Sequence, residues 1–245
     1  ATGKLVHYSP YDTSGNIYPG PLSTDSGFWD AYRTVYPMLH LVYPDLVGDV
    51  LVGWVNALRE DPEGMLVQWA SPGRVNSMVG SMGEVSLAEG IVNGALVGDD
   101  AKDAYAYIKK SATQITQNGR AMMHEYLQSG YIPQGQGEES SVSLSLNYYL
   151  SDFAVSLAAQ HLGDATTSRV LRERSRNWRK LFDSEDTQFF RPKSKVGKFV
   201  EPFKEFEWMG PYTEGGPWQY RFYVPHDPLG LREAYEASRK TKSAT

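Results

Sequence analysis

Apolar residues recur at helical spacing along most of this chain of 245 residues. The segment FWDAYRTVYPMLHLVYPDLVGDVLVGWVNALRED predicts two helices, over about residues 28–43 and 44–60, with Pro44 in the first turn of the second helix. The same spacing predicts further helices over about residues 77–93, 101–114, 119–130, 141–163 and 165–183, from near Pro217, and over about 228–241.

The segments between the predicted helices alternate between tight turns and longer loops. Residues 1–27 and 61–76 are rich in turn-forming residues, and residues 184–213 form a long Phe-rich loop with one Trp. The stretch SLSLNYY alternates like a strand, but the length of the segment that contains it favours a helix. The pattern therefore predicts an all-α protein, either a toroid of helical hairpins or a plain α-solenoid.

Composition and charge exclude several classes of protein. No stretch approaches the roughly 18 uncharged apolar residues of a transmembrane helix. Lys and Arg number 24 against 29 Asp and Glu, a net charge of -5 without a basic cluster, which does not suit nucleic-acid binding. Because Cys is absent, a disulfide framework, a thiolate metal site and a cysteine nucleophile are excluded. The start ATGKLVHYSP has no signal-peptide pattern.

Aromatic residues are abundant, at 13% of the chain with 16 Tyr and 6 Trp. Flat rings stack on the faces of pyranose sugars and carboxylates bond sugar hydroxyls, so this composition suits a carbohydrate site. The alternative is that the rings pack between helices, and composition alone favours that alternative.

Carboxylates are the candidate catalytic groups, because HExxH, GxSxG and Walker A motifs are absent. In GPYTEGGPWQYRFYVPHD, Glu214 lies in a Gly-rich turn among Tyr212, Trp218 and Tyr220. Aromatic walls would remove water from the carboxyl group and raise its pKa, as a general acid requires. A carboxylate that caps the following helix, kept ionised by the helix dipole, is an equal alternative.

Two other segments combine aromatic and polar residues. In GFWDAYR, Asp30 either pairs with Arg33 on the surface or binds sugar hydroxyls while Trp29 stacks on the ring. In QWASPGRVNSMVGSMGEVSLAEG, the loop carries Gln68, Trp69, Arg74 and Asn76, and the helix carries Glu84 and Glu89. Both acids are expected on an exposed face of that helix.

Taken in order, these segments resemble glycoside hydrolase family 92, the calcium-dependent exo-acting α-mannosidases. GFWDAYRTVYPMLHLVYP resembles the family's WDT(F/Y)R stretch, and QWASPGRVNSMVG resembles its Trp–Gly–Met segment. GYIP and the Ser-rich helix start after it are similar to a further family loop and helix. The closest stretch is YTEGGPWQYRFYVPHD, where the family shows YTEG followed by WQY and VPHD.

The resemblance implies roles for the matched residues. Glu214 matches the general acid that protonates the departing glycosidic oxygen. Trp29 and Asp30 match a pair that contacts the terminal mannose, and Arg33 of the same segment is grouped with them as substrate-binding. The other matched positions are expected to line or support the substrate site, and they are Trp218, Gln219, His226 and Asp227.

The resemblance also implies an (α/α)6 helical toroid preceded by a β-sandwich. A toroid of this kind needs twelve helices and about nine are predicted, so an incomplete (α/α)6 toroid is expected. Residues 1–245 are then part of one catalytic domain, with the N-terminal β-sandwich and the C-terminal part of the toroid absent from this chain. An inverting glycosidase needs a second carboxylate as base, and the family's GNDD-type motif for it does not occur before Thr245. The chain alone is expected to be inactive.

The chain departs from the family pattern at several positions. Gly216 and Pro217 stand where the family usually has Asn-Ala, and Pro is acceptable in a first helical turn. Met82 stands where the family commonly has His, and Glu89 stands in place of Asp. These changes affect the expected sugar contacts and leave the acid in place.

The implied function is removal of terminal α-linked mannose from glycans with inversion, in a secreted, periplasmic or otherwise extracytoplasmic enzyme. Ca2+ is the implied cofactor, with ligands expected mostly outside this chain. The expected partners are mannose-containing glycans and the remaining part of the same enzyme, with no nucleic acid and no membrane. Two alternatives stay open: a non-catalytic glycan-binding or structural subunit with the same fold, and another (α/α)6 hydrolase such as a trehalase or glucosidase relative.

Overall fold

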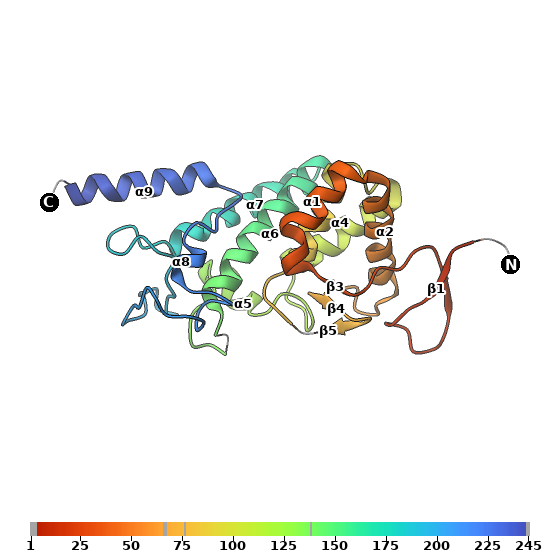
Figure 1. The fold of residues 1–245 in the computed structure, drawn as a ribbon, viewed down its shortest axis with the longest axis horizontal. Coiled ribbons are helices and arrows are strands. Elements are labelled where there is room, and N and C mark those ends of the chain that lie inside the picture. The colour runs from red at the N-terminus through yellow and green to blue at the C-terminus, as the bar shows by residue number, and fades with distance from the viewer. Residues whose placement is uncertain (1–3, 66–67, 76, 138, 244–245) are drawn as a thin grey trace. The chain divides into compact units, whose positions relative to one another are not determined.

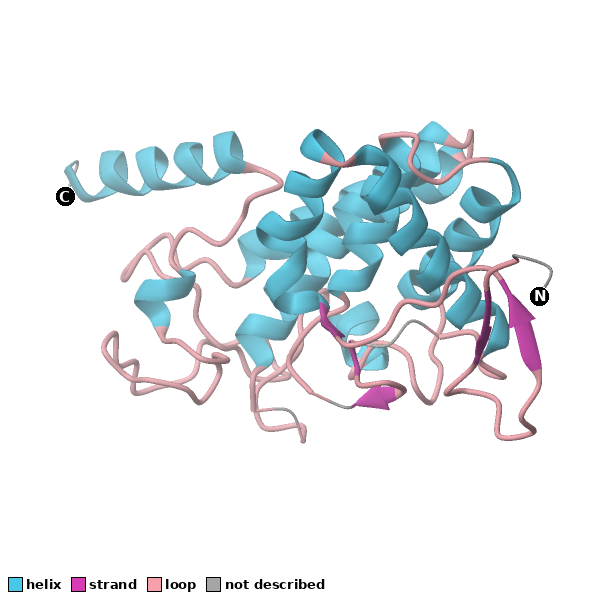
Figure 2. Ribbon diagram, turned by 45° about the vertical axis from the view of Figure 1, so that its right-hand side comes forward, coloured by secondary structure: helices cyan, strands magenta, loops and turns pink. Residues whose placement is uncertain are grey.

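The computed structural model describes residues 4–65, 68–75, 77–137 and 139–243. In this part of the chain, helices dominate and the strands are only two or three residues long (Figure 2). The helices are α1 (Phe28–Val42), α2 (Pro44–Glu60), α3 (Met82–Val92), α4 (Gly98–Thr113), α5 (Met123–Ser129), α6 (Ser141–His161), α7 (Ala165–Ser175), a 3-10 helix (Arg176–Lys180), α8 (Pro217–Tyr220) and α9 (Pro228–Ser243). The predicted all-α class is confirmed.

Short strands fill parts of the segments that the sequence predicts as loops. They are β1 (Val6–Tyr8), β2 (Ile17–Pro19), β3 (Ser26–Gly27), β4 (Trp69–Ala70) and β5 (Arg74–Val75). β1 pairs antiparallel with β2, and β4 lies between β3 and β5 in a second antiparallel sheet. These pairings are too short to produce a detectable period of two in the sequence.

The chain forms two compact units, one of residues 1–121 with 154–171 and the other of residues 122–153 with 172–245. In the first unit, α1 packs against α2 and α3, and α4 packs against the same two helices (Figure 1). A tight turn at Tyr43 joins α1 to α2, and Pro44 takes the predicted first-turn position. Helices α1 to α4 are therefore two neighbouring helical hairpins, as expected of an incomplete helical toroid.

Aromatic side chains fill the interior of the first hairpin. Phe28 and Trp54 are almost fully buried, with ring centroids 4.8 Å apart. The Trp54 indole N–H donates a 3.0 Å hydrogen bond to the Tyr36 hydroxyl, so this buried polar group has a partner. Many rings of the chain thus pack between helices, which is the alternative that composition favours.

Glu84 is a correction to the sequence analysis, because it is fully buried instead of lying on an exposed face. Its carboxylate accepts hydrogen bonds from Arg120 Nη2 at 2.5 Å and from the Ser111 hydroxyl at 2.5 Å. Arg120 is buried as well. Burial of a charged group requires an opposite charge and hydrogen bonds, and both come here from segments distant in sequence.

Several helix boundaries differ from the prediction, including the start of α4 at Gly98 and of α5 at Met123, and the differences are largest at α3 and α7. α3 begins at Met82 and not near residue 77, because Met78 and Gly80 have positive φ angles of 60° and 89° that break a right-handed helix. Asn76 lies outside the described residues. α7 ends at Ser175, where the chain tightens into the 3-10 helix before the long loop. Both differences fall at helix ends, where local sequence is least informative.

α6 is buried along most of its length and on all sides. Its polar residues are mostly serines, which are small and can bond their own helix. The Ser145 hydroxyl, for example, donates to the Ser141 carbonyl at 2.6 Å and accepts the Ile132 N–H at 2.9 Å. A helix that is polar in sequence can therefore be packed from every direction.

Asp164 joins α4 to the start of α7 within the first unit. Its carboxylate accepts hydrogen bonds from Lys109 at 2.6 Å and Tyr105 at 2.8 Å, and it caps α7 by accepting the Thr167 N–H at 3.0 Å. The bond from Lys109, and then those from Thr167 and Tyr105, hold the pKa of Asp164 well below its usual range. An ionised Asp164 therefore stabilises the folded state.

We expect Arg120→Met to lower the free energy of unfolding by about 3–5 kcal/mol, because Glu84 would be left charged and unpaired in the interior. Chemical denaturation would measure the change. Lys102→Met is the control, since Lys102 and its partner Asp99 are exposed, and it should leave the midpoint nearly unchanged. Equal effects of the two substitutions would contradict the role of the buried pair.

We expect Asp164→Asn to destabilise the protein at neutral pH and to matter less in acid. The folded-state pKa of Asp164 is lowered, so its stabilisation is complete above its unfolded pKa of about 3.9 and is lost as the pH falls through the folded value. Asn keeps the helix cap, so the difference reports the charge. Chemical denaturation of the wild-type protein and of Asp164→Asn at pH 7 and pH 3 would measure the free energy of unfolding of each. If the two proteins differ as much at pH 3 as at pH 7, the prediction is wrong.

Candidate active site

Glu214 lies in the loop between the long Phe-rich segment and α8, in the second unit. Its φ angle is +47°, in the left-handed region that costs a residue with a side chain about 1–2 kcal/mol. Its side chain is exposed. An exposed carboxyl group on a strained backbone is a common feature of functional sites.

The backbone on the N-terminal side of Glu214 is fixed by α6 and α8. The Thr213 N–H donates to the Ser143 hydroxyl at 2.8 Å, and the Tyr220 hydroxyl donates to the Thr213 carbonyl at 2.7 Å. Two residues before Thr213, the Pro211 carbonyl accepts the Val142 N–H at 3.0 Å in the first turn of α6. Glu214 therefore follows a residue whose donor and acceptor are both engaged.

The backbone on the C-terminal side is fixed in the same way. The Gly215 carbonyl accepts the Met209 N–H at 2.7 Å, and the Gly216 N–H donates to the Gln219 side chain at 2.9 Å. Gln219 is therefore a helix-capping residue of α8 in this structure. The four bonds around Glu214 hold its main chain without using its carboxyl group.

The two interpretations of Glu214 from sequence both assume surroundings that differ from those observed. Tyr212 and Tyr220 are buried away from water, whereas Glu214 itself is exposed, so the aromatic side chains do not wall in the carboxyl group. The cap of α8 comes from Gly216 and Gln219, so Glu214 does not cap it either. The sequence predicted that Glu214 lies in a loop before a helix, but it did not predict that the Glu214 side chain is exposed to solvent.

Trp29, Asp30 and Arg33 occupy the first turns of α1, in the first unit. Trp29 is 8% exposed and Asp30 is exposed. The Arg33 guanidinium lies 5.0 Å from the Trp29 ring centroid, and its Nε–H donates to the Trp29 carbonyl at 3.2 Å. Arg33 thus supports Trp29 and leaves the Asp30 carboxylate facing solvent.

Trp69 fixes the entry into α1. Gly27 pairs with Trp69 across β3 and β4, and a Cβ atom at Gly27 would lie only 2.6 Å from the Trp69 ring. Only glycine allows this approach. The nearby Arg74 pairs with Asp61 at 2.5 Å, and Gln68 is half-buried. This loop therefore builds the platform on which the Trp29 segment begins.

His226 and Asp227 make structural contacts in the second unit. Asp227 caps α9 through the Gly230 N–H at 3.1 Å and accepts the Trp178 indole N–H at 3.1 Å. His226 bonds the Ser175 carbonyl at 3.1 Å, which requires the proton on Nε2, and burial lowers the pKa of its imidazole. The VPHD motif thus joins the end of α7 to the start of α9.

Three buried polar atoms in the matched motifs have no hydrogen-bond partner among the described residues. They are Trp29 Nε1, Thr213 Oγ1 and His226 Nδ1. An unsatisfied buried polar atom costs about 1–3 kcal/mol and calls for an explanation.

Trp218, another residue of the matched motifs, is not buried. Its side chain is 43% exposed, and its ring packs edge-on against Phe189 with a centroid distance of 5.0 Å.

The described residues contain no group of three or more His, Asp or Glu side chains that could hold a metal ion. Glu89, the acid that replaces the family's Asp, is half-buried and has a pKa raised by burial. Its carboxylate lies 3.9 Å from His40 Nε2, too far for a hydrogen bond.

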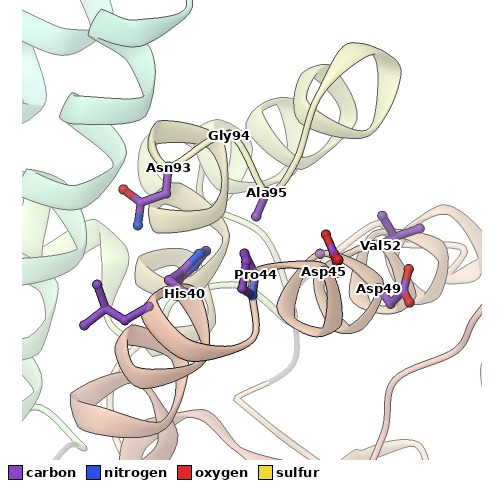
Figure 3. A pocket seen from close by; sticks show the side chains of 10 residues that line it. His40, Pro44, Asp45, Asp49, Val52, Asn93, Gly94 and Ala95 are labelled. Atoms are coloured by element: carbon purple, nitrogen blue, oxygen red, sulfur yellow. The ribbon is translucent and has the colours of Figure 1, made fainter.

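A pocket of about 660 Å3 lies in the first unit, where α1 turns into α2 and α3 is followed by its own turn (Figure 3). Its polar lining includes His40, Asp45, Asp49 and Asn93. Burial lowers the pKa of His40, which favours the neutral imidazole. None of the residues predicted for the substrate site lines this pocket, so it does not identify the site.

No helix in the described part of the chain is long and apolar enough to cross a membrane.

Comparisons with known proteins agree with the motifs. The inverting mannosidase BT2199 of family GH92 from Bacteroides thetaiotaomicron VPI-5482 is 31% identical, with a TM-score of 0.88 over 96% of this chain. The family GH92 α-mannosidase BT3965 from Bacteroides thetaiotaomicron, solved with mannoimidazole, is 25% identical, with a TM-score of 0.82 over 96% of this chain. The chain spans only 31% and 32% of the length of these two proteins.

A comparison with curated proteins gives no match. The sequence model of the glycosyl hydrolase family 92 catalytic domain, in contrast, matches residues 2–244. Because this match covers nearly the whole chain, the chain belongs to glycosyl hydrolase family 92.

Proposed function

We propose that this chain carries the general acid of an inverting α-mannosidase that removes terminal α-linked mannose from glycans. The observation that carries the proposal is the presentation of Glu214, an exposed carboxyl group on a left-handed backbone position held by hydrogen bonds on both sides. Family membership supports it, as do an inverting mannosidase and an α-mannosidase among the similar structures.

In the proposed reaction, the Glu214 carboxyl group donates its proton to the glycosidic oxygen as the bond to mannose C1 breaks. A water molecule attacks C1 from the opposite face of the ring, and a second carboxylate removes a proton from that water. The attack inverts the configuration at C1. The hydrogen-bonded loop fixes the main chain from which the Glu214 carboxyl group extends, and a fixed main chain favours the positioning that general-acid catalysis requires.

We assign the second carboxylate to residues outside this chain. Residues 1–245 are then part of one (α/α)6 catalytic domain that is completed by further helices and by an N-terminal β-sandwich. The 31% share of the BT2199 length that the chain spans supports this assignment. The chain alone has the acid without the base and is expected to be inactive.

The substrate-binding roles of Trp29, Asp30 and Arg33 stay a proposal that rests on the family motif. The free indole N–H of Trp29 and the exposed carboxylate of Asp30 support it, since both can bond a sugar hydroxyl. Gln219 and Asp227 are better explained as positioning residues, because each caps a helix through its side chain. His226 is assigned the same role through its bond to the end of α7, and Trp218 is retained as a substrate contact.

Calcium enters the proposal only through the family. Its ligands are assigned mostly to residues outside this chain, and no step of the proposed reaction is assigned to the ion. The same family resemblance supports an extracytoplasmic location and mannose-containing glycans as partners.

We expect Glu214→Gln in the complete enzyme to lower kcat on unactivated mannosides by about 10^2- to 10^4-fold, because Gln cannot donate the proton. Mannose release from methyl α-mannoside would measure it. Glu185→Gln, which changes an exposed glutamate elsewhere in the second unit, is the control and should keep normal turnover. Near-normal turnover by Glu214→Gln would reject the acid assignment.

The alternative of a non-catalytic glycan-binding subunit makes the opposite prediction. Such a protein would bind mannose-containing glycans and release no mannose, with or without Glu214. Calorimetric titration with an α-mannoside beside the release assay separates the two functions, since an enzyme must show both binding and turnover.

The strain at Glu214 predicts a gain in stability when the position becomes glycine. We expect Glu214→Gly to be about 0.5–1 kcal/mol more stable than Glu214→Ala, because glycine adopts a φ of +47° without a steric penalty. Urea denaturation of both variants would measure the difference. Glu185 has no positive φ, so it serves as the control position. There we expect Glu185→Gly to be less stable than Glu185→Ala, the reverse of the order at position 214.

A further inference from the structure

β1 and β2 form an antiparallel hairpin in the first unit, and one face of this hairpin is polar (Figure 2). His7 and Tyr18 are directly opposite each other in the pair, and their rings stack at a centroid distance of 6.0 Å. His7 Nε2 lies 2.9 Å from the Glu60 carboxylate at the end of α2. The His7 and Glu60 side chains are only 10% and 6% exposed. The polar face is therefore the one that attaches the hairpin to α2.

The opposite face of the hairpin is apolar and exposed. Side chains alternate between the two faces of a strand, and directly paired residues share a face. The pairs Val6–Pro19 and Tyr8–Ile17 therefore lie together on the face away from His7. Val6, Tyr8 and Ile17 are 54%, 66% and 60% exposed, and Pro19 is exposed as well. These four neighbouring residues form one exposed surface, which we call the apolar face of the hairpin.

This arrangement is the reverse of what a hairpin on a free surface requires. An antiparallel sheet with one solvated face normally turns its apolar face to the core and its polar face to water. Here the contact between His7 and Glu60 holds the polar face inward and leaves the apolar face outside. Two strands alone are also only marginally stable in water and need a further layer to pack on. The apolar face is therefore expected to be covered in the complete protein.

The loop of the hairpin is held in one conformation by Asp12. Its carboxylate accepts hydrogen bonds from the Ser14 N–H at 2.8 Å, from the Asn16 amide at 2.9 Å and from the Tyr18 hydroxyl at 2.7 Å. Because Tyr18 belongs to the polar face, these bonds join the loop to the strands. The apolar face is thus presented in a fixed geometry, which lowers the entropic cost of packing another surface on it.

The covering segment that the geometry favours is the one that precedes residue 1. Val6 is five residues from position 1, so the end of a domain joined there lies within about 18 Å of Val6 at the full extension of the chain. Such a short connection raises the effective concentration of that domain at the hairpin. Because this chain spans only 31% of the length of BT2199, a relative of that size has a large part that could cover the face.

We propose that the apolar face of the hairpin is the docking surface for the domain that precedes this chain, the β-sandwich of the proposed domain organisation. Apolar faces of two sheets pack on each other at a spacing of about 10 Å, so the hairpin supplies one half of a sheet-on-sheet contact. The inference rests on the proposed function, which includes that domain. A second copy of the chain and the helices that complete the toroid are the competing occupants.

Photo-crosslinking in the complete enzyme identifies what covers the face. p-Benzoylphenylalanine in place of Tyr8 keeps an aromatic ring at this position, and mass spectrometry maps the peptides that it captures. We expect crosslinks to peptides that precede residue 1 in the same polypeptide. The same amino acid in place of Tyr43 is the control, since Tyr43 is 57% exposed in the turn between α1 and α2, and it should not give these crosslinks.

Thiol labelling of the complete enzyme measures whether the face is covered. We expect Ile17→Cys to react about tenfold more slowly than Thr13→Cys in the native state, because a covered thiol is not accessible to the reagent. The two variants should react at similar rates after denaturation. Thr13 is the matched position, since it is exposed in the loop of the same hairpin. This chain has no cysteine of its own, and the unsubstituted enzyme gives the background rate.

Several results would overturn the docking. Crosslinks from position 8 to peptides after residue 245 would mean that the helices of the toroid cover the face, and crosslinked dimers would mean that a second copy does. The absence of any crosslink would mean that the preceding domain does not reach the face. Equal native labelling rates of Ile17→Cys and Thr13→Cys would mean that the face is free.

These readouts do not use mannose release, so the acid assignment of Glu214 is tested separately by Glu214→Gln. A failure of the docking would leave that assignment in place. A complete enzyme without a domain before residue 1 would overturn both the docking and the proposed domain organisation.

Discussion

The first turn of α6 is the constraint on which the proposed site depends. The opening N–H groups of a helix have no acceptor within the helix and must find one outside it. Here the Pro211 carbonyl accepts the N–H groups of Val142 and Ser143, at 3.0 and 3.3 Å, and the Ser143 hydroxyl accepts the Thr213 N–H in return. The position of Glu214 is therefore set by the end of a long, rigid and buried helix. A loop of this length would otherwise have many conformations.

The VPHD motif illustrates how a family motif can be structural and functional at once. Asp227 caps α9 and holds the Trp178 indole, while His226 bonds the end of α7. These contacts fix the segments on either side of the acid loop. These contacts explain much of the motif without a substrate contact, although His226 Nδ1 has no hydrogen-bond partner among the described residues.

The parts of the structure that depend on local pattern could be predicted from the sequence. Helical spacing, Pro44 in a first turn and Gly130 at a helix end follow from neighbouring residues, and the structure has them all. The burial of Glu84 could not be predicted, because its partner Arg120 is 36 residues away. The exposure of Glu214 could not be predicted either, because it depends on which way Tyr212 and Tyr220 turn.

The close approach of Gly216 to the Glu207 carbonyl links two positions that can only change together. A side chain at 216, such as the Asn that the family usually has there, would collide with the backbone of the 207–209 segment. In this chain, the backbone next to the proposed acid therefore depends on the absence of a side chain at position 216.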